Sequence, residues 1–383
     1  MKVNANKSAL AIIFPNSYDN EVPSLVNERL MASIPFAGRY RIIDFILSSL
    51  VNNNIDNVSI IVRKNYRSLM RHLGNGREWD LSRKNGGLNI VPPFAEKTVK
   101  VYNGRVEALA SILTFLKQQS EDYVFISDAN IVMNFDFKAM LKAHINNDAD
   151  VTIAYKSEPI PYGFMNLQPT VTTDLYYTLK LDDTGRVSEI QTNPKELGAQ
   201  NLSMNIYLLK RELLIELIEK AYAAGYVFFE RDILSPKLDE LKIYGYNYEG
   251  YTARITDMLS YFNENLKLLD DENLDALFKP SPIYTRVRDD NPTRYIGKAR
   301  VRNSMVADGC VIEGEVENCV IFKGVKIGKG AVVRNSVIMY DTTIMGNADV
   351  DYVITDKNVT IGSGKELKGN ASFPVFVPAF KSI

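Results

Sequence analysis

The sequence has very few of the side chains that bind transition metals or form disulfides. Cys310 and Cys319 are its only cysteines, and His72 and His144 are its only histidines. Four such residues leave too little for a zinc site built from cysteine and histidine, and two cysteines argue against a disulfide framework. We therefore expect a protein that keeps its thiols reduced in the cytoplasm.

Long apolar runs and an excess of one charge are also missing. No stretch approaches the roughly 20 apolar residues that a membrane-spanning helix needs. The first ten residues lack the apolar core of a signal peptide. The formal net charge is -1, and no dense run of lysine and arginine occurs. These absences argue against a membrane protein and against a nucleic-acid-binding surface, but they are compatible with a local phosphate site.

The first two-thirds of the 383 residues alternate short apolar runs with amphipathic segments. Uninterrupted apolar strands separated by helices indicate a Rossmann-like α/β domain with a mixed, mostly parallel sheet. Ligands of such sheets bind at the carboxyl ends of the strands, so the loops after Phe14 and Ser127 would border a site. The predicted strands lie near residues 8–14, 57–62, 123–127 and 150–155. The predicted helices lie near residues 42–50, 105–119 and 137–145.

From about Ile296 the sequence repeats units of about six residues. This period is typical of a left-handed parallel β-helix, in which each short strand forms one edge of a triangular coil. Antiparallel strands joined by glycine turns are the alternative. We predict an α/β domain over 1–255, a connector of one helix and a Pro-rich extended run over 256–295, and a β-helix over 296–383. The six-residue step occurs in two runs, Ile321, Ile327, Val333 and Ile338, Ile344, Val350.

Four segments carry distinctive motifs: "PFAGRYRIIDFILSS" (Pro35–Ser49), "GRVEAL" (Gly104–Leu109), "SMNIYLL" (Ser203–Leu209) and "YFNENLKLL" (Tyr261–Leu269). They resemble motifs of ADP-glucose pyrophosphorylases, whose layout is also a nucleotidyltransferase domain followed by a β-helix. Enzymes of that family make ADP-glucose from ATP and glucose 1-phosphate for glycogen or starch. The resemblance covers almost the whole chain. In the order given, the four segments resemble F-G-G-K/R-Y/F-R-I-I-D-F-x-L-S-N, G-T-A-D-A-V, S-M-G-I-Y-x-F and the helix after W-R-D-V-G-T.

The sequence departs from the family pattern at the positions where the resemblance places its chemistry. The phosphate loop, G-G-x-G-x-R in the family, lacks its glycines here and carries Glu21 in place of the arginine. Met31 and Asn193 stand in place of two lysines, and Ala129 and Arg254 stand in place of two metal-binding aspartates. Phosphoryl transfer depends on Mg²⁺ and on cations that neutralise phosphate charge. The resemblance therefore implies no catalytic residue, no metal site and little or no catalysis in this chain.

The concentrated losses resemble the GlgD-type non-catalytic subunit of bacterial glycogen biosynthesis. This likeness implies a cytoplasmic regulatory or structural subunit that has no cofactor of its own. Its partner would be a catalytic homologue, joined in a heterotetramer, and Mg²⁺ is expected only in that homologue. Two alternatives stay open. One is an active homomeric sugar-nucleotide pyrophosphorylase that uses displaced groups such as Asp19 and Asp128, and the other is a non-enzymatic assembly or sensor protein of the same fold.

Basic residues beside the altered loop suggest a binding site for an anion. Arg29, Arg39 and Arg41 form a stripe, and in the family the position of Arg39 helps to bind phosphate effectors between the two domains. A phosphate or sugar-phosphate effector is one interpretation, and a solvated face or an interdomain ion pair is the other. His72 could add to such a site or be structural. Ser203 matches a sugar-phosphate contact of the family, or it is a hydrogen-bonding residue of a strand.

Apolar residues beside the inward series of the β-helix predict a contact with the partner chain. Val320, Phe322, Val332 and Met339 are more than a narrow coil needs to fill its interior. Exposed apolar area of this kind usually marks an interface. We therefore expect these four side chains on an outer face of the β-helix.

Overall fold

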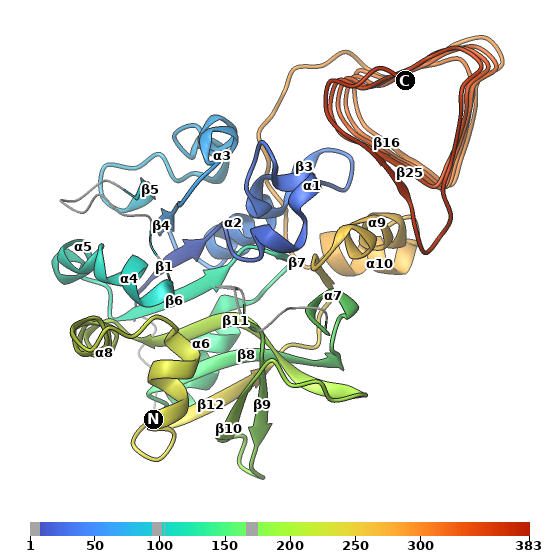
Figure 1. The fold of residues 1–383 in the computed structure, drawn as a ribbon. Coiled ribbons are helices and arrows are strands. Elements are labelled where there is room, and N and C mark those ends of the chain that lie inside the picture. The colour runs from blue at the N-terminus through green and yellow to red at the C-terminus, as the bar shows by residue number, and fades with distance from the viewer. Residues whose placement is uncertain (1–7, 94–101, 103, 166–174) are drawn as a thin grey trace.

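The computed structural model describes residues 8–93, 102, 104–165 and 175–383. An α/β domain forms the N-terminal two-thirds, and a triangular coil of short strands stands beside it (Figure 1). Both parts of the predicted fold class are confirmed, because the main sheet is mixed and the coil is a left-handed parallel β-helix made of three parallel sheets.

In the part of the chain that the structure describes, the main sheet has nine strands. Seven follow the order β10–β9–β11–β6–β1–β4–β5, while β8 pairs with β11 and β12 pairs with β8. The pairs β1–β4, β1–β6 and β4–β5 are parallel, and β11 runs antiparallel to β6 and β8. The strands are β1 (Ala9–Phe14), β4 (Asn57–Ile61), β5 (Gly87–Val91), β6 (Tyr123–Asp128), β8 (Val151–Pro159), β9 (Tyr177–Leu181), β10 (Val187–Thr192), β11 (Ala199–Lys210) and β12 (Ile243–Asn247).

Side chains of the central strands alternate between two apolar cores, as the two-residue period of a strand requires. Leu10 and Ile12 of β1 join the core with α4, α5 and α8, whereas Ala11 and Ile13 join the core with α2, α3 and α6. Helices therefore cover both faces of the sheet. Their bounds are α1 (Pro23–Val26), α2 (Ile42–Asn52), α3 (Arg67–Leu73), α4 (Arg105–Ala110), α5 (Leu113–Gln118), α6 (Phe137–Asn146), α7 (Tyr162–Met165), α8 (Arg211–Ala223), α9 (Met258–Lys267) and α10 (Asp271–Phe278).

Two predicted helices differ in the structure. The segment 105–119 is not one helix, because it breaks between α4 and α5. The hydroxyl of Ser111 donates to the carbonyl of Ala108 at 2.7 Å, a local bond that competes with the helical pattern, and Ile112 leaves the helical region at φ -109. The connector holds two helices rather than one, since Asp270 caps α10 by accepting from the amides of Glu272 and Asn273.

The β-helix begins at β14 and its strands stack in three five-stranded parallel sheets. The first sheet is β14 (Arg294–Tyr295), β17 (Val311–Ile312), β20 (Lys326–Ile327), β23 (Thr343–Ile344) and β26 (Thr360–Ile361). The second is β15 (Arg300–Arg302), β18 (Glu315–Glu317), β21 (Val332–Arg334), β24 (Asp349–Asp351) and β27 (Glu366–Lys368). The third is β16 (Met305–Val306), β19 (Val320–Ile321), β22 (Val337–Ile338), β25 (Val353–Thr355) and β28 (Val375–Val377).

Inward apolar residues and left-handed corners explain why this segment coils. Every member of the two six-residue runs is buried inside the coil. At one corner, Asn303, Asn318 and Asn335 have φ values of 40, 53 and 44, a region that asparagine tolerates better than most residues. Their side chains stack, because the Asn303 amide donates to Asn318 at 2.7 Å and the Asn318 amide donates to Asn335 at 3.2 Å. The corner ladder therefore fixes the register of successive coils.

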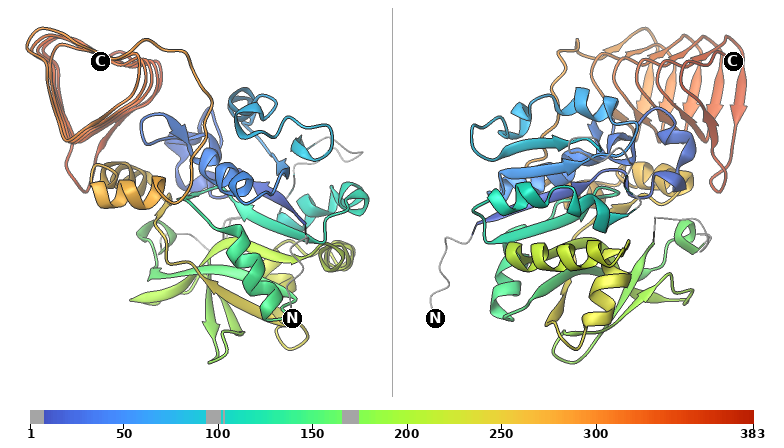
Figure 2. Two further views of the ribbon diagram at one scale, coloured as in Figure 1. Left: turned by 180° about the vertical axis from the view of Figure 1, so that it is seen from behind. Right: turned by 60° about the vertical axis from the view of Figure 1, so that its left-hand side comes forward.

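The β-helix packs against its own chain, which corrects one expectation. Val320, Phe322 and Met339 have no exposed surface and share a core with α9, α10 and the segment that contains Phe36. Figures 1 and 2 show α9 and α10 beside the coil. Only Val332, on β21, is partly exposed. The apolar excess is wrong as evidence for a partner surface, because most of it forms the junction between the two domains.

The remaining elements are short. Two small sheets pair β2 (Pro35–Phe36) with β3 (Tyr40–Arg41) and β7 (Ile131–Met133) with β13 (Thr252–Arg254). Throughout the part of the chain that the structure describes, no helix combines the length and the apolar character needed to cross a bilayer.

Candidate functional site

The loop after β1 folds back on itself through side-chain hydrogen bonds. Asn16 donates to Asp19 at 2.7 Å, and the other oxygen of Asp19 accepts from the backbone amide of Met31 at 2.7 Å. Tyr18 adopts a left-handed conformation at φ 63. The segment is thus held by side chains and is not a ring of open amides that could surround phosphates. Glu21 lies in the short turn Asp19–Glu21 that follows.

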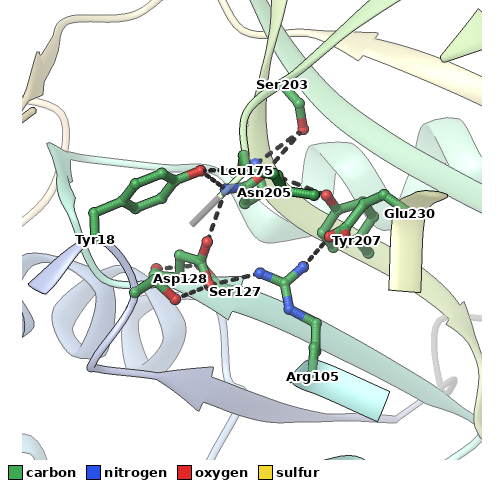
Figure 3. A network of polar contacts seen from close by, with 10 residues as sticks. Tyr18, Arg105, Ser127, Asp128, Leu175, Ser203, Asn205, Tyr207 and Glu230 are labelled. Atoms are coloured by element: carbon green, nitrogen blue, oxygen red, sulfur yellow. Dashed lines mark hydrogen bonds and ion pairs between the residues drawn. The ribbon is translucent and has the colours of Figure 1, made fainter. Parts of the chain in front are cut away.

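Asp128, at the carboxyl end of β6, is the centre of a buried polar network (Figure 3). One carboxylate oxygen accepts from the hydroxyl of Ser17 at 2.6 Å and from Arg105 at 2.8 Å. The other accepts from the side-chain amide of Asn205 at 2.7 Å. We call Ser17, Tyr18, Arg105, Asp128, Asn205 and Glu230 the centre network. Both oxygens of Asp128 are therefore engaged by the chain itself.

The guanidinium of Arg105 lies between two carboxylates. It pairs with Asp128 on one side and contacts Glu230 on the other (Figure 3). Its side chain is 13% exposed, and the carboxylates of Asp128 and Glu230 are 1% and 5% exposed. Burial by itself would lower the pKa of Arg105, but the charges of Asp128 and then Glu230 raise that pKa well above its ordinary value. A permanent cation thus sits between the two acids.

A bulge in β11 brings Asn205 into this network. The register of β11 against β8 shifts between Ser203 and Ile206, and Asn205 has a φ of 53. Its amide reaches the phenol oxygen of Tyr18 at 2.8 Å as well as Asp128, and Tyr18 donates onward to the carbonyl of Leu175. The hydroxyl of Ser203 accepts from the Asn205 backbone amide at 3.1 Å. Ser203 therefore supports the bulge, which is a structural role within the strand.

Four residues stand in place of the family's metal-binding aspartates and lysines, and each of them packs against or bonds to the rest of the chain. Arg254 forms an ion pair of 3.0 Å with Glu158 and donates to the carbonyl of Ser203 at 3.2 Å. Ala129 is 2% exposed within an apolar core, and Met31 is fully buried in another. Asn193 sits in a turn at φ 49 and accepts from the backbone amide of Tyr176 at 2.9 Å.

Two small cavities among the described residues border the centre network. One of about 70 Å³ lies toward Phe14 and Arg63, and one of about 40 Å³ lies toward Asp128 and Phe228. Ligand pockets typically have ~300–1,000 Å³, so neither cavity is of the size that a nucleotide needs. Among the described residues, no group of three or more histidine, cysteine, aspartate or glutamate side chains is arranged to hold a metal ion.

A larger cavity of about 620 Å³ lies at the junction between the α/β domain, the connector and the β-helix. We call it the junction cavity. Five arginines and two lysines line it, and Asp341 is the only carboxylate among the described residues around it. Arg39, Arg41 and His72 of the predicted anion site all belong to this lining. The remaining cations are Arg71, Arg286, Arg288, Lys323 and Lys357.

Arg29 is not part of the junction cavity. Its guanidinium is 6% exposed and pairs with Asp356 of the β-helix at 2.6 Å. This contact matches the interdomain ion pair that was the alternative interpretation of the basic stripe. His72 has a structural partner as well, because its Nε2 lies 2.5 Å from a carboxylate oxygen of Asp44. Asp44 also accepts from the hydroxyl of Thr285 in the connector at 2.6 Å.

Known proteins of the same layout match along most of the chain. The Nucleotidyl transferase family matches residues 25–251, and the GlmU-like C-terminal hexapeptide family matches residues 289–371. The glycogen biosynthesis protein GlgD of Bacillus subtilis is 33% identical over 97% of this chain and 95% of its own length. The chain belongs to the GlgD and glucose-1-phosphate adenylyltransferase family. GlgD of Geobacillus stearothermophilus is 37% identical over 86% of this chain and 83% of its own length, and the glucose-1-phosphate adenylyltransferase of the same organism is 33% identical over 86% and 84%.

Membership in the GlgD and glucose-1-phosphate adenylyltransferase family explains which residues sequence reasoning missed. Arg105 stands at the threonine of the family word G-T-A-D-A-V, and Asn205 stands at the glycine of S-M-G-I-Y. Both differences were visible in the sequence as departures from the motifs of the family. Their consequence was not visible, because it depends on a contact between residues 77 positions apart, Asn205 and Asp128. Glu230 gave no comparable signal.

Proposed function

We propose that this chain is a regulatory subunit of a cytoplasmic, hetero-oligomeric glucose-1-phosphate adenylyltransferase in glycogen biosynthesis, with little or no catalysis of its own. Its relatives are named as glycogen biosynthesis proteins and as glucose-1-phosphate adenylyltransferases, which supports the pathway. A catalytic homologue would perform the reaction of ATP with glucose 1-phosphate. Mg²⁺ would act in that partner.

One observation carries the proposal, namely that the chain's own side chains engage or replace the groups that a reaction would need. Both oxygens of Asp128 accept hydrogen bonds from the chain, and Arg254 contributes a positive charge at a position where the family has a metal-binding aspartate. A divalent cation would meet a guanidinium there rather than a ligand. This charge arrangement supports a chain that does not carry out phosphoryl transfer.

An active homomeric enzyme that uses Asp19 and Asp128 is less well supported. Asp19 accepts from Asn16 and from the backbone amide of Met31, so both of its oxygens hold the loop together. Asp128 is likewise surrounded by Ser17, Arg105 and Asn205. Recruiting either carboxylate for catalysis would break two or more buried hydrogen bonds, each with a net cost of ~0.5–1.5 kcal/mol or more.

An assay of ADP-glucose formation with purified proteins tests the proposal. We expect no Mg²⁺-dependent turnover by this chain alone. Addition of the chain to a catalytic homologue from the same cell should change the activity or the effector response of that homologue. Turnover by the chain alone in the range of the homologue would contradict the proposal, and so would a homologue whose kinetics stay the same in a verified complex.

We further propose that the junction cavity binds an anionic effector, such as inorganic phosphate or a sugar phosphate. The described lining of the cavity contains seven cationic side chains and a single carboxylate. Burial has the largest effect on Arg41 and lowers its pKa, while Tyr340 and Asp44 raise that pKa and the charges of Arg29 and Arg71 lower it. Guanidinium groups suit the geometry of phosphate oxygens. An anion held there would contact both domains and the connector at once, which gives binding a route to change their arrangement.

Arg39 provides the test, because it is exposed, lines the cavity and forms no ion pair with any residue that the structure describes. Arg39→Ala should weaken the effect of inorganic phosphate or sugar phosphates on the assembled enzyme several-fold while the complex still forms. Arg302→Ala is the matched control, since Arg302 is an exposed arginine on β15 of the β-helix outside the cavity lining. An effector response that is the same in both variants and the native chain would assign Arg39 to the solvated surface.

Assembly through the β-helix needs a different surface from the one first expected. Since Val320, Phe322 and Met339 are buried in the chain's own domain junction, removal of residues from Ile296 onward would expose that junction and would not test a partner contact. Met345, beside β23, is 45% exposed on the coil and is a better probe. Met345→Glu should reduce co-purification with the catalytic homologue. Met70→Glu is the control, because Met70 on α3 has the same exposure.

A further inference from the structure

The side chain of Arg105 is enclosed on several sides. In addition to Asp128 and Glu230, two aromatic rings flank the guanidinium, with ring centroids 5.2 Å away for Phe14 and 5.4 Å away for Tyr207. Rings at this distance attract a cation through their quadrupoles. Two acids and two rings therefore form a complete small-cation site, and the chain's own guanidinium fills it.

Arg105 also lines both of the cavities that border the centre network. The 70 Å³ cavity and the 40 Å³ cavity share two lining residues, Ser17 and Arg105. Ser17 is a small side chain, so the arginine is the larger group that the two cavities share. Removing the arginine beyond its Cβ would enlarge both cavities and leave Asp128 and Glu230 without the guanidinium between them.

The backbone that carries Arg105 is held in place by close packing. Gly104 precedes it, and a Cβ added at Gly104 would lie 2.4 Å from the carbonyl oxygen of Val227. The amide of Val106 donates to the same carbonyl at 3.3 Å. Asp232 in turn accepts from the amides of Val227 and Phe228. The start of α4 and the segment that carries Glu230 are thus fixed to each other, so the backbone of Arg105 is held beside its acidic partner.

We propose that Arg105 is an internal occupant of the space at the carboxyl ends of β1 and β6, where it fills a latent site for a planar, guanidinium-like cation between Asp128 and Glu230. The site is defined by the two buried carboxylates, the amide of Asn205 and the flanking rings of Phe14 and Tyr207. Loss of the arginine side chain would leave two buried acids without a counter-ion, an arrangement that is strongly unfavourable. A free cation of the same shape would then bind in its place. This inference concerns this chain alone and does not depend on the partner.

Chemical rescue tests the proposal on the full-length chain. Arg105→Ala should unfold several degrees below the native protein, and guanidinium chloride at millimolar concentration, far below denaturing levels, should raise its midpoint. Arg105→Met should also be destabilised, because methionine brings no positive charge to the two acids. Guanidinium should not restore its stability, because the methionine side chain fills the volume that the cation would need. Sodium chloride and tetramethylammonium chloride at equal ionic strength should not rescue either variant.

Arg83→Ala is the matched control. Arg83 also bridges two carboxylates, Asp56 and Asp80, but its side chain is 39% exposed and water already solvates the acids. Its midpoint should change little and should not respond to guanidinium. Should Arg105→Ala fail to fold, the double variant Arg105→Ala with Glu230→Gln removes one of the two unpaired charges and takes its place in the titration.

A second readout separates the electrostatic role from simple packing. In Arg105→Met the two acids lack a counter-charge, so they should take up protons more readily, and the difference in midpoint from the native protein should shrink as the pH falls through the carboxylate range. A packing role predicts that Arg105→Met is as stable as the native protein at every pH. That result, or a guanidinium response that is equal in all variants, would overturn the proposal. Neither result would bear on whether the chain regulates a catalytic homologue.

Discussion

The guanidinium of Arg29 donates a hydrogen bond of 2.6 Å to the carboxylate of Asp356, although 327 positions separate the two residues in the sequence. The pair joins the loop region of the α/β domain to the β-helix. Both side chains are almost buried, at 6% and 8% exposure. Two positions after Arg29, the amide of Met31 donates to Asp19, so the same short segment connects the β-helix to the altered phosphate loop.

Breaking this pair should destabilise the junction between the domains. Removing one partner of a buried ion pair leaves an uncompensated charge and costs ~3–5 kcal/mol. We therefore expect Arg29→Ala and Asp356→Ala each to lower the denaturation midpoint strongly, and the double variant to cost much less than the sum. Urea titrations that follow circular dichroism and the fluorescence of Trp79, the single tryptophan, measure both effects.

The control for this prediction is a weaker pair at the same junction. Glu28 lies 3.6 Å from Lys357, and the two side chains are 53% and 29% exposed. Exposed pairs contribute ~0–1 kcal/mol because water already solvates both charges. Glu28→Ala should therefore have little effect. Equal losses in Glu28→Ala and Arg29→Ala would show that the buried pair is not special.

The pH dependence of stability should contain a contribution from Glu264 on α9. Burial raises the pKa of Glu264 above its ordinary value of 4.5, while the neighbouring Lys267 lowers it, and the net change is upward. The folded state then binds the proton more tightly than the unfolded state. The stabilising contribution is full below the unfolded pKa and is lost as pH rises through the raised folded pKa. Glu264→Gln should consequently be more stable than the native protein at neutral pH and lose that advantage in acid.

Glu216 offers a control of opposite sign. Its hydrogen bond to Lys220 lowers the pKa of Glu216, so its contribution is present above the unfolded pKa and is lost as pH falls through the lowered folded pKa. Thermal midpoints of Glu216→Gln should lie slightly below those of the native protein at neutral pH and converge with them in acid. Parallel pH profiles for the two variants would contradict both assignments.

Neither cysteine should react with thiol reagents while the chain is folded. Cys310 and Cys319 are 1% and 0% exposed. Burial raises the pKa of Cys319 to about 12 and that of Cys310 in the same direction, so the reactive thiolate is scarce at pH 8. Titration with a chromogenic disulfide should count two thiols only after unfolding. Ser372→Cys, at an exposed position, should add one fast-reacting thiol. A fast reaction of the folded native chain, which lacks that cysteine, would disprove the burial argument.

The sequence was sufficient to predict the fold class because both parts of the molecule follow short periods. Six-residue steps placed Ile321, Ile327 and Val333 inside the coil, and the structure buries all three. The motifs of the family identified Ala129 and Arg254 as the residues that stand in place of two metal-binding aspartates. Patterns of this kind depend on neighbours in the sequence or on a fixed repeat, and both can be recognised without knowing the tertiary structure.

The errors arose where the outcome depends on contacts between distant segments. Phe322 and Met339 looked like spare apolar residues because the sequence does not reveal that α9 packs on that face of the coil. Arg29 and Arg39 looked equivalent, yet one pairs with Asp356 and the other lines the junction cavity. The break near Ser111 depends on one side-chain hydrogen bond, which periodicity does not report.

Substitutions of Asn205 should follow a definite order of stability. The backbone there is left-handed at φ 53, which costs other L-residues ~1–2 kcal/mol but costs glycine nothing. Its side chain satisfies Asp128 and Tyr18. Asn205→Gly keeps the favourable backbone and loses those hydrogen bonds, whereas Asn205→Ala loses the bonds and adds backbone strain.

Asn205→Asp should be the least stable of the series at neutral pH, because it brings a second carboxylate to within hydrogen-bond distance of Asp128 in a buried site. Aspartate also tolerates the left-handed region, so the backbone of this variant is not strained. The repulsion between the two carboxylates should outweigh that advantage. The difference in midpoint between Asn205→Asp and the native protein should become smaller in acid, because a protonated carboxyl group can donate a hydrogen bond to the other carboxylate. Midpoints in the order native, glycine, alanine, aspartate at pH 7 are therefore expected. An alanine variant as stable as the glycine variant would show that the bulge can relax, and that the centre network does not depend on the left-handed geometry at this position.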